Sequence, residues 1–89
     1  MARMGMDVDA VEVVSKQLKT QAQNIGTLVA SIDKMVNGLT GIWDGQDAHA
    51  FVTSWWPQHK KELLTAQTQI EGLGQSAWNN AQEQRKASS

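Results

Sequence analysis

The sequence predicts an all-α fold: an antiparallel helix-turn-helix hairpin that dimerises into a four-helix bundle. Apolar residues recur at helical spacing in both halves of the chain. The glycines best placed to break a helix, Gly38, Gly41 and Gly45, gather between these halves. A single hairpin of 89 residues covers only part of each apolar stripe. We therefore expect one domain over residues 1–89, with a second chain covering the rest of the stripe.

The first helix is expected over about residues 9–38. Asp9 and Glu12 have the spacing of a capping box, which places the helix start near Asp9. Apolar residues then recur every seventh residue, with a second set three residues after the first, as in the seam of a helical bundle. The core positions predicted on this helix are Val11, Val14, Leu18, Ile25, Leu28, Ile32, Met35 and Leu39.

A turn is expected over about 39–46 and a second helix over about 47–83. Asp44 or Asp47 can cap this helix. The apolar spacing lengthens across Pro57, and a proline inside a helix removes a backbone hydrogen bond, so a kink is expected there. The core positions predicted on the second helix are Phe51, Trp55, Leu63, Ile70 and Leu73.

Two details of the second helix follow from single residues. Trp55 is expected in the core, whereas Trp56 points to a different side and is expected to be partly exposed or to lie on the flank of the dimer. Gly72 and Gly74 lower helix propensity by up to ~1 kcal/mol each, which predicts looser last turns. Residues 84–89 hold no apolar side chain larger than alanine and are expected to form a flexible tail.

Composition and charge argue against several classes of function. The net charge is -1 and neither half carries a basic block, so nucleic acid is not an expected partner. No window reaches the ~20 apolar residues of a membrane span, so stable membrane insertion is not expected, and no stretch has the form of a signal peptide. His49 and His59 stand ten residues apart, without the spacing of metal ligands. We expect no enzyme activity, because no nucleophile is paired with a base, and no metal or other cofactor.

The middle of the chain carries a recognisable motif. The stretch from Trp43 through Gly45 to Trp55 resembles the signature of the W-x-G family, the small proteins of bacterial type VII secretion that include the early secreted antigenic target of mycobacteria. Trp43 and Gly45 supply the signature itself, and the glycine permits a tight backbone at the turn while the indole can cover the end of the bundle. The resemblance extends over nearly the whole chain.

The resemblance implies a function and partners. It implies a non-enzymatic secreted substrate or carrier, exported folded by an ATP-driven type VII machine and not through a cleaved signal peptide. The implied partners are the secretion ATPase and either a second copy or a sister W-x-G protein, giving a homodimer or a heterodimer. Virulence association is a common property of such proteins.

The chain departs from the family at its C-terminal export signal, a tyrosine followed four residues later by Asp or Glu. It has no tyrosine: the nearest analogue is Trp78, with Gln82 four residues later and Glu83 one position further. Trp43, Trp78 and Glu83 are therefore the candidate residues of a secretion-recognition surface. The alternative function is an intracellular, chaperone-like partner that pairs with a larger effector or sister protein and lacks an export signal of its own.

Overall fold

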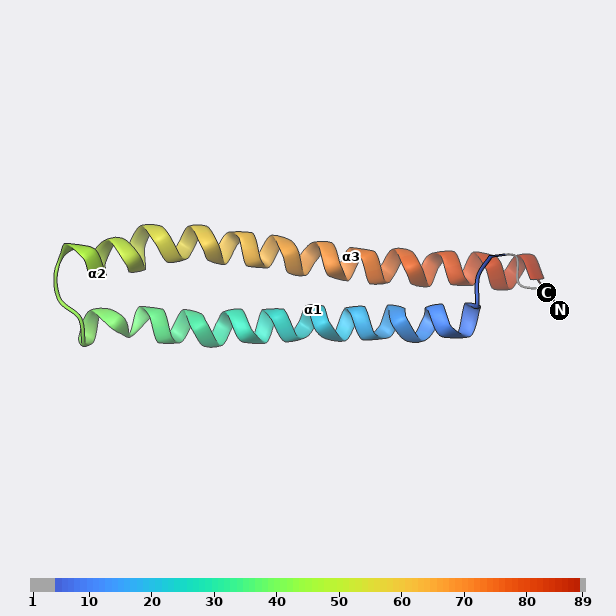
Figure 1. The fold of residues 1–89 in the computed structure, drawn as a ribbon, viewed down its shortest axis with the longest axis horizontal. Coiled ribbons are helices and arrows are strands. Elements are labelled where there is room, and N and C mark those ends of the chain that lie inside the picture. Colours follow the sequence, from blue (N-terminus) through green and yellow to red (C-terminus); the bar gives the residue numbers. More distant parts are fainter. Residues whose placement is uncertain (1–4, 89) are drawn as a thin grey trace. The chain divides into compact units, whose positions relative to one another are not determined.

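The computed structural model describes residues 5–88, which form two long helices joined as a hairpin (Figure 1). Helix α1 spans Val8–Asn37 and helix α3 spans Trp56–Ser88. Between them lie the 3-10 turn η1 (Leu39–Gly41), the short helix α2 (Gln46–Ala50) and the π-helical turn η2 (Phe51–Trp55). The described residues contain no β-strand. The predicted all-α hairpin is confirmed.

Contacts along the chain divide it into two units. Unit 1 joins Met1–Ala22 with Thr68–Ser89, so that the first part of α1 lies beside the last part of α3. Unit 2 is the continuous stretch Gln23–Gln67, which holds the rest of α1, the turn and the start of α3. Each unit has its own set of packed side chains.

Unit 1 is packed through small residues. Ser15 is fully buried and its hydroxyl donates a hydrogen bond of 2.8 Å to the carbonyl oxygen of Gly74. A Cβ built on Gly74 would lie 3.0 Å from the carbonyl oxygen of Ser15 and 3.2 Å from the Cβ of Leu18. Ala22 and Ala81 complete the buried set. Gly74 therefore lets the two backbones approach closely, and α3 continues through it as a helix.

The start of α1 is capped two residues earlier than the sequence predicts. The backbone N–H of Ala10 donates to the side-chain carboxylate of Asp7 at 3.2 Å, and the N–H of Val11 donates to the Asp7 carbonyl at 2.9 Å. Asp7 is thus the capping residue, and the helix begins at Val8. Asp9 and Glu12, the predicted capping box, instead bind a residue of α3.

That residue is Arg85, which lies in the segment predicted to be a flexible tail. Its guanidinium donates to Asp9 at 2.8 Å and to Glu12 at 2.9 Å, and the two carboxylates raise the pKa of Arg85. Gln82 also donates to Glu12, at 2.6 Å. These contacts give the last turns of α3 partners, and the helix runs to Ser88, past its predicted end near residue 83. Ser89 lies outside the described residues.

Unit 2 has an apolar core centred on Val29, Val36 and Trp56, all buried. The indole N–H of Trp56 donates to the carboxylate of Asp33 at 2.9 Å, so its polar atom has a partner. The partly buried side chains that pack against this core are Ile25, Ile32, Leu39, Phe51 and Val52.

The π-helical turn explains which of two neighbouring tryptophans is buried. Trp56 is 5 % exposed, so the prediction that it is partly exposed is wrong, whereas Trp55, predicted in the core of the hairpin or dimer, is 51 % exposed in the single chain. The N–H of Trp56 donates to the carbonyl of Phe51, five residues earlier, which adds one residue to the turn. That extra residue places Trp56 where regular α-helical spacing would place Trp55. It also accounts for the longer apolar spacing just before Pro57.

The buried line on α1 lies one residue later than predicted. It passes through Ser15 and Ala22 in unit 1 and through Val29 and Val36 in unit 2, at seven-residue intervals. The other predicted positions on α1 flank this line as half-buried side chains: Val11, Leu18, Ile25, Ile32 and Leu39. The predicted core of the hairpin or dimer also includes residues that the single chain leaves exposed, and their burial in a dimer stays a prediction: Val14, Leu28, Met35, Leu63 and Leu73.

Candidate functional site

The turn in unit 2 depends on Gly45. Gly45 has φ +112°, a conformation that L side chains rarely adopt, and it is the N-cap of α2 with no side-chain cap. The prediction that Asp44 or Asp47 caps this helix is therefore wrong. Upstream, the N–H of Trp43 donates to the carbonyl of Leu39 at 2.7 Å, which fixes the backbone that carries the indole. The structure thus gives both residues of the motif a defined place in the turn.

Aromatic rings follow one another from the turn onto the second helix. The ring centroids of Trp43 and Phe51 lie 6.1 Å apart, and those of Phe51 and Trp55 are stacked at 4.7 Å. The rings of Trp55 and His59 follow at 4.1 Å. These spacings lie at or near the range in which aromatic pairs attract one another beyond simple burial. We call these four residues the aromatic ladder.

Beside the ladder runs an open groove of about 520 Å³. Trp43, Phe51 and Trp55 supply aromatic surface, and Asp47, Ser54 and Gln58 supply oxygen atoms that can accept hydrogen bonds. Ala50 completes the lining. The groove therefore combines ring faces with a carboxylate.

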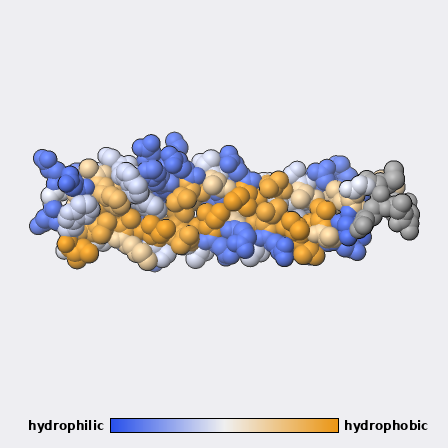
Figure 2. All heavy atoms as spheres, in the orientation of Figure 1, coloured by the Kyte–Doolittle hydropathy of each residue, from blue (hydrophilic) through white to orange (hydrophobic). Residues whose placement is uncertain are grey.

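Unit 2 also exposes large apolar side chains outside the groove. Leu28 is 59 % and Met35 68 % exposed, and their seven-residue spacing places them on one side of α1; Ile42, which follows η1, is 85 % exposed. Leu63 on α3 is exposed as well. We call Leu28, Met35, Ile42 and Leu63 the apolar face of unit 2. Apolar residues are visible on the surface of this unit in Figure 2.

The contacts of Asp33 lie on the other side of the core of unit 2. The Asp33 carboxylate accepts from Trp56 and forms an ion pair with Lys60 at 3.1 Å. The Trp56 and Lys60 hydrogen bonds hold the pKa of Asp33 below its usual value. With 100° per residue, Asp33 lies about 40° to one side of Val29, and Leu28 lies about 100° to the other. Unit 2 thus has a polar side and an apolar side.

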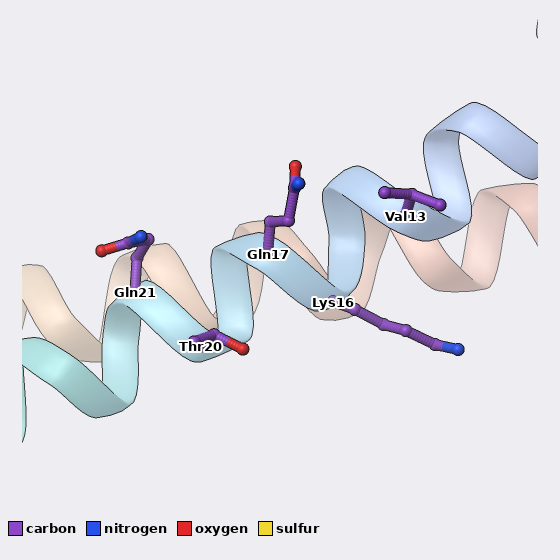
Figure 3. Close-up of a pocket in the computed structure, with 5 residues that line it drawn as sticks. All are labelled: Val13, Lys16, Gln17, Thr20 and Gln21. Atoms are coloured by element: carbon purple, nitrogen blue, oxygen red, sulfur yellow. The ribbon is translucent and has the colours of Figure 1, made fainter.

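Unit 1 exposes apolar residues too: Val13, Val14 and Leu73. Val13 lines a hollow of about 260 Å³ on the outer surface of α1 (Figure 3). The side chains around this hollow all come from α1, and Lys16 extends away from Gln17 and Gln21 (Figure 3). The hollow is therefore a gap between solvent-exposed side chains of one helix.

The remaining candidates for a secretion-recognition surface belong to unit 1. Trp78 is half-buried, and the ammonium nitrogen of Lys16 lies 5.6 Å from the centroid of its ring. Glu83 is exposed. The structure therefore gives Trp78 a partner within its own unit.

Sequence reasoning missed the small buried residues and the polar pair at the centre of unit 2. Ser15, Gly74 and Ala81 are buried, but they are small residues, and the sequence prediction of a seam rests on large apolar side chains. The seven-residue series from Ser15 to Val36 is visible in the sequence, one position after the predicted series that contains Val14, Leu28 and Met35. Nothing in the local sequence marks Asp33 as the acceptor for Trp56, because the two are 23 positions apart.

Among the described residues, no group of three or more metal-ligating side chains is present. None of the described helices combines the length and the apolar character required to span a membrane. Comparison with protein-family models, with curated proteins and with solved structures finds no match to this chain.

Proposed function

We propose that this chain is a non-enzymatic pairing protein of bacterial type VII secretion: a substrate or carrier that forms a four-helix bundle with a second helical chain. The observation that carries the proposal is the apolar face of unit 2, Leu28, Met35, Ile42 and Leu63, beside a turn that holds Trp43 and Gly45. Leu28 and Met35 share one side of α1, and large exposed apolar residues gathered on one surface mark a site for a partner.

The area of the chain supports pairing. It exposes 6512 Å². A compact monomer of its mass exposes about 5,200 Å², roughly 1,300 Å² less. A stable protein interface buries about 800 Å² on each partner. The exposed area beyond that of a compact monomer is therefore large enough for a second helical hairpin to cover.

The link to secretion rests on the turn. The resemblance to W-x-G proteins requires a tryptophan and a glycine between two amphipathic helices, and Gly45 occupies a positive φ at the start of the second helical segment. The partner is a second copy or a sister protein with the same fold. The proposed contacts with the secretion ATPase involve Trp43, Trp78 and Glu83.

Export tests the proposal directly. The untagged chain is produced in a bacterium that has a type VII machine, together with the product of the neighbouring gene, and the medium is compared with that of a strain lacking the export ATPase. We expect the chain in the medium of the first strain alone. Trp43→Leu is expected to reduce export, and Ala30→Gln, an exposed change outside both the motif and the apolar face, serves as its control.

Retention of the chain inside the cell in both strains would contradict the secreted function. Together with a stable complex with the neighbouring product, that result would favour the second candidate, an intracellular chaperone-like partner. The absence of tyrosine from the chain, and hence of the usual export signal, is the observation that favours this candidate.

A further inference from the structure

We propose that the groove beside the aromatic ladder binds an arginine side chain presented by a partner protein. This proposal goes beyond pairing through the apolar face of unit 2, because it concerns different residues and a different chemistry. It stands on three features of unit 2: partly exposed tryptophans, a carboxylate with no partner among residues 5–88, and a stretch of chain without lysine or arginine.

The two tryptophans that line the groove are partly exposed. Trp43 is 42 % exposed and Trp55 is 51 % exposed, although both contact Phe51. The rings of Phe51 and His59 both contact the ring of Trp55 and hold it in place, and about half of Trp55 remains exposed. The electron-rich face of tryptophan attracts a cation more strongly than the faces of the other aromatic side chains do. The chain already makes one such contact, between Lys16 and Trp78 in unit 1.

The carboxylate of Asp47 lines the same groove. Among residues 5–88, it makes no side-chain hydrogen bond or ion pair, in contrast to the carboxylate of Asp33. Ser54 and Gln58 add a hydroxyl and an amide oxygen as further acceptors. Since a guanidinium carries five donors in one plane and stacks on aromatic rings, arginine suits this set better than lysine.

Charge complementarity selects a cationic occupant. Residues 35–59 contain Asp44 and Asp47 and no lysine or arginine. On α3 the nearest lysines are Lys60, which is paired with Asp33 on the polar side of the unit, and Lys61, three residues after Gln58. An incoming arginine thus meets negative charge and no competing cation within this stretch. Arg85 of a second copy is a poor source of that arginine, because it already binds Asp9 and Glu12.

The test uses a blocked tetrapeptide, acetyl-Ala-Arg-Leu-Ala-amide, and the same peptide with citrulline in place of arginine. Citrulline keeps the length and the planar end of arginine but has no charge. Each peptide is titrated into the full chain, and the indole N–H signals of the four tryptophans are followed by NMR. We expect the arginine peptide to shift the signals of Trp43 and Trp55 saturably and to bind at least about fivefold more tightly than the citrulline peptide.

Two variants with matched controls locate the site. Asp47→Asn is expected to weaken binding about three- to tenfold, whereas Glu71→Gln, the same charge change at an exposed position of unit 1, leaves it unchanged. Trp55→Leu keeps an apolar side chain but removes the ring face and is expected to weaken binding to a similar degree. Because Trp55 is half exposed, its replacement leaves the core of unit 2 intact, which circular dichroism verifies.

Equal binding of the arginine and citrulline peptides would overturn the proposal, since the groove would then recognise shape or apolar surface. Absence of any saturable shift of Trp43 and Trp55 would overturn it as well. Neither result bears on pairing, which is read from the mass of the chain in solution. Conversely, a monomeric chain that still prefers the arginine peptide would contradict the pairing and leave the groove assignment standing.

Discussion

At the scale of single residues, Gly74 shows how a residue that weakens a helix can be required by packing. In an isolated helix, alanine is more stable than glycine by about 0.8–1 kcal/mol. In unit 1, however, a Cβ at position 74 would lie 3.0 Å from the carbonyl oxygen of Ser15, and a backbone atom cannot move aside as a flexible side chain can. The packing cost therefore opposes the gain in propensity.

Replacing the two glycines of α3 by alanine separates these effects. A Cβ at Gly72 meets nothing within 4 Å, so Gly72→Ala is expected to stabilise the chain by about 0.5–1 kcal/mol. Gly74→Ala is expected to destabilise it by about 1–2 kcal/mol. Urea unfolding followed by circular dichroism measures both. Equal stabilisation by the two changes would show that the close approach at Gly74 does not constrain the backbone.

Asp33 gives a prediction about pH. Its pKa is lowered in the folded chain by the hydrogen bond from Trp56 and by Lys60, so the ionised form is favoured on folding. The resulting stability is present above the unfolded value of 3.8 and is lost as the pH falls through the lower folded value. The difference in unfolding free energy between the wild type and Asp33→Asn is therefore expected to shrink as the pH drops below about 4.

The control for this prediction is Asp44→Asn. Among the described residues, Asp44 has no side-chain hydrogen bond or ion pair, so its replacement is expected to change stability little at any pH. Urea unfolding of the three proteins between pH 7 and pH 2.5 makes the comparison. A constant difference between wild type and Asp33→Asn over the whole range would contradict the assigned contact.

At the scale of elements, the π-helical turn η2 sets the phase between the turn and α3. Ala48, Val52 and Trp56 face the core at four-residue spacing, which would drift by about 40° at each step of a regular α-helix. The bond from Trp56 to Phe51 takes up the extra residue. It also lies immediately before Pro57, whose ring would clash with the carbonyl four residues earlier in a regular helix.

Deleting one residue tests whether η2 is such an insertion. Thr53 in η2 and Thr65 in α3 are both exposed, and each hydroxyl donates to the carbonyl four residues earlier. In a Pro57→Ala background, which removes the clash of the proline ring, deletion of Thr53 is expected to restore regular helix and keep the two flanks in phase. Deletion of Thr65 rotates one flank by about 100° and is expected to abolish cooperative unfolding.

Thermal unfolding of the two deletion variants, followed by circular dichroism, compares them. The account expects a cooperative transition for the Thr53 deletion and a broad one for the Thr65 deletion. Loss of cooperativity in both would show that η2 is a fixed part of the fold and not an inserted residue.

The elements themselves could be predicted from sequence more readily than the faces they bury. Apolar periodicity and the glycines near residue 40 predicted two helices and a turn, and α1 was placed within one residue at each end. Burial was assigned to large side chains, so Leu28 and Met35 were chosen in place of neighbouring Val29 and Val36. A seven-residue repeat gives the spacing of a seam; which of two adjacent repeats faces the partner helix depends on packing across the hairpin.

The C-terminal end of α3 and the turn before it were harder to predict, because they depend on contacts that the local sequence does not indicate. Arg85 extends α3 by binding Asp9 and Glu12, more than 70 positions earlier in the chain, so local composition indicated a tail. Trp56 is buried because η2 contains an extra residue. No single residue type predicts a π-helical turn from the sequence. The motif of Trp43 and Gly45 was placed correctly in a turn, whereas the groove beside it follows from the aromatic ladder and was not predicted.

At the scale of the whole molecule, unit 2 has three different surfaces, and we expect each of them to have a different role. Its polar side is occupied by the Asp33 ion pair, its groove offers rings and a free carboxylate, and its apolar face is uncovered. Pairing would place Leu28 and Met35 in contact with apolar groups of another chain. Each such side chain contributes about 1.5–3 kcal/mol when fully buried.

The mass of the chain in solution tests pairing most directly. Light scattering is measured on the purified chain, alone and mixed with the product of the neighbouring gene, and on the double variant Leu28→Gln, Met35→Gln. Ala30→Gln, a change at an exposed position away from the apolar face, is the control. We predict twice the mass of the chain, or a one-to-one complex, for the wild type and the control, and the mass of a single chain for the double variant. A single-chain mass for the wild type in both conditions, or a complex that the double variant leaves unchanged, would contradict pairing through the apolar face of unit 2.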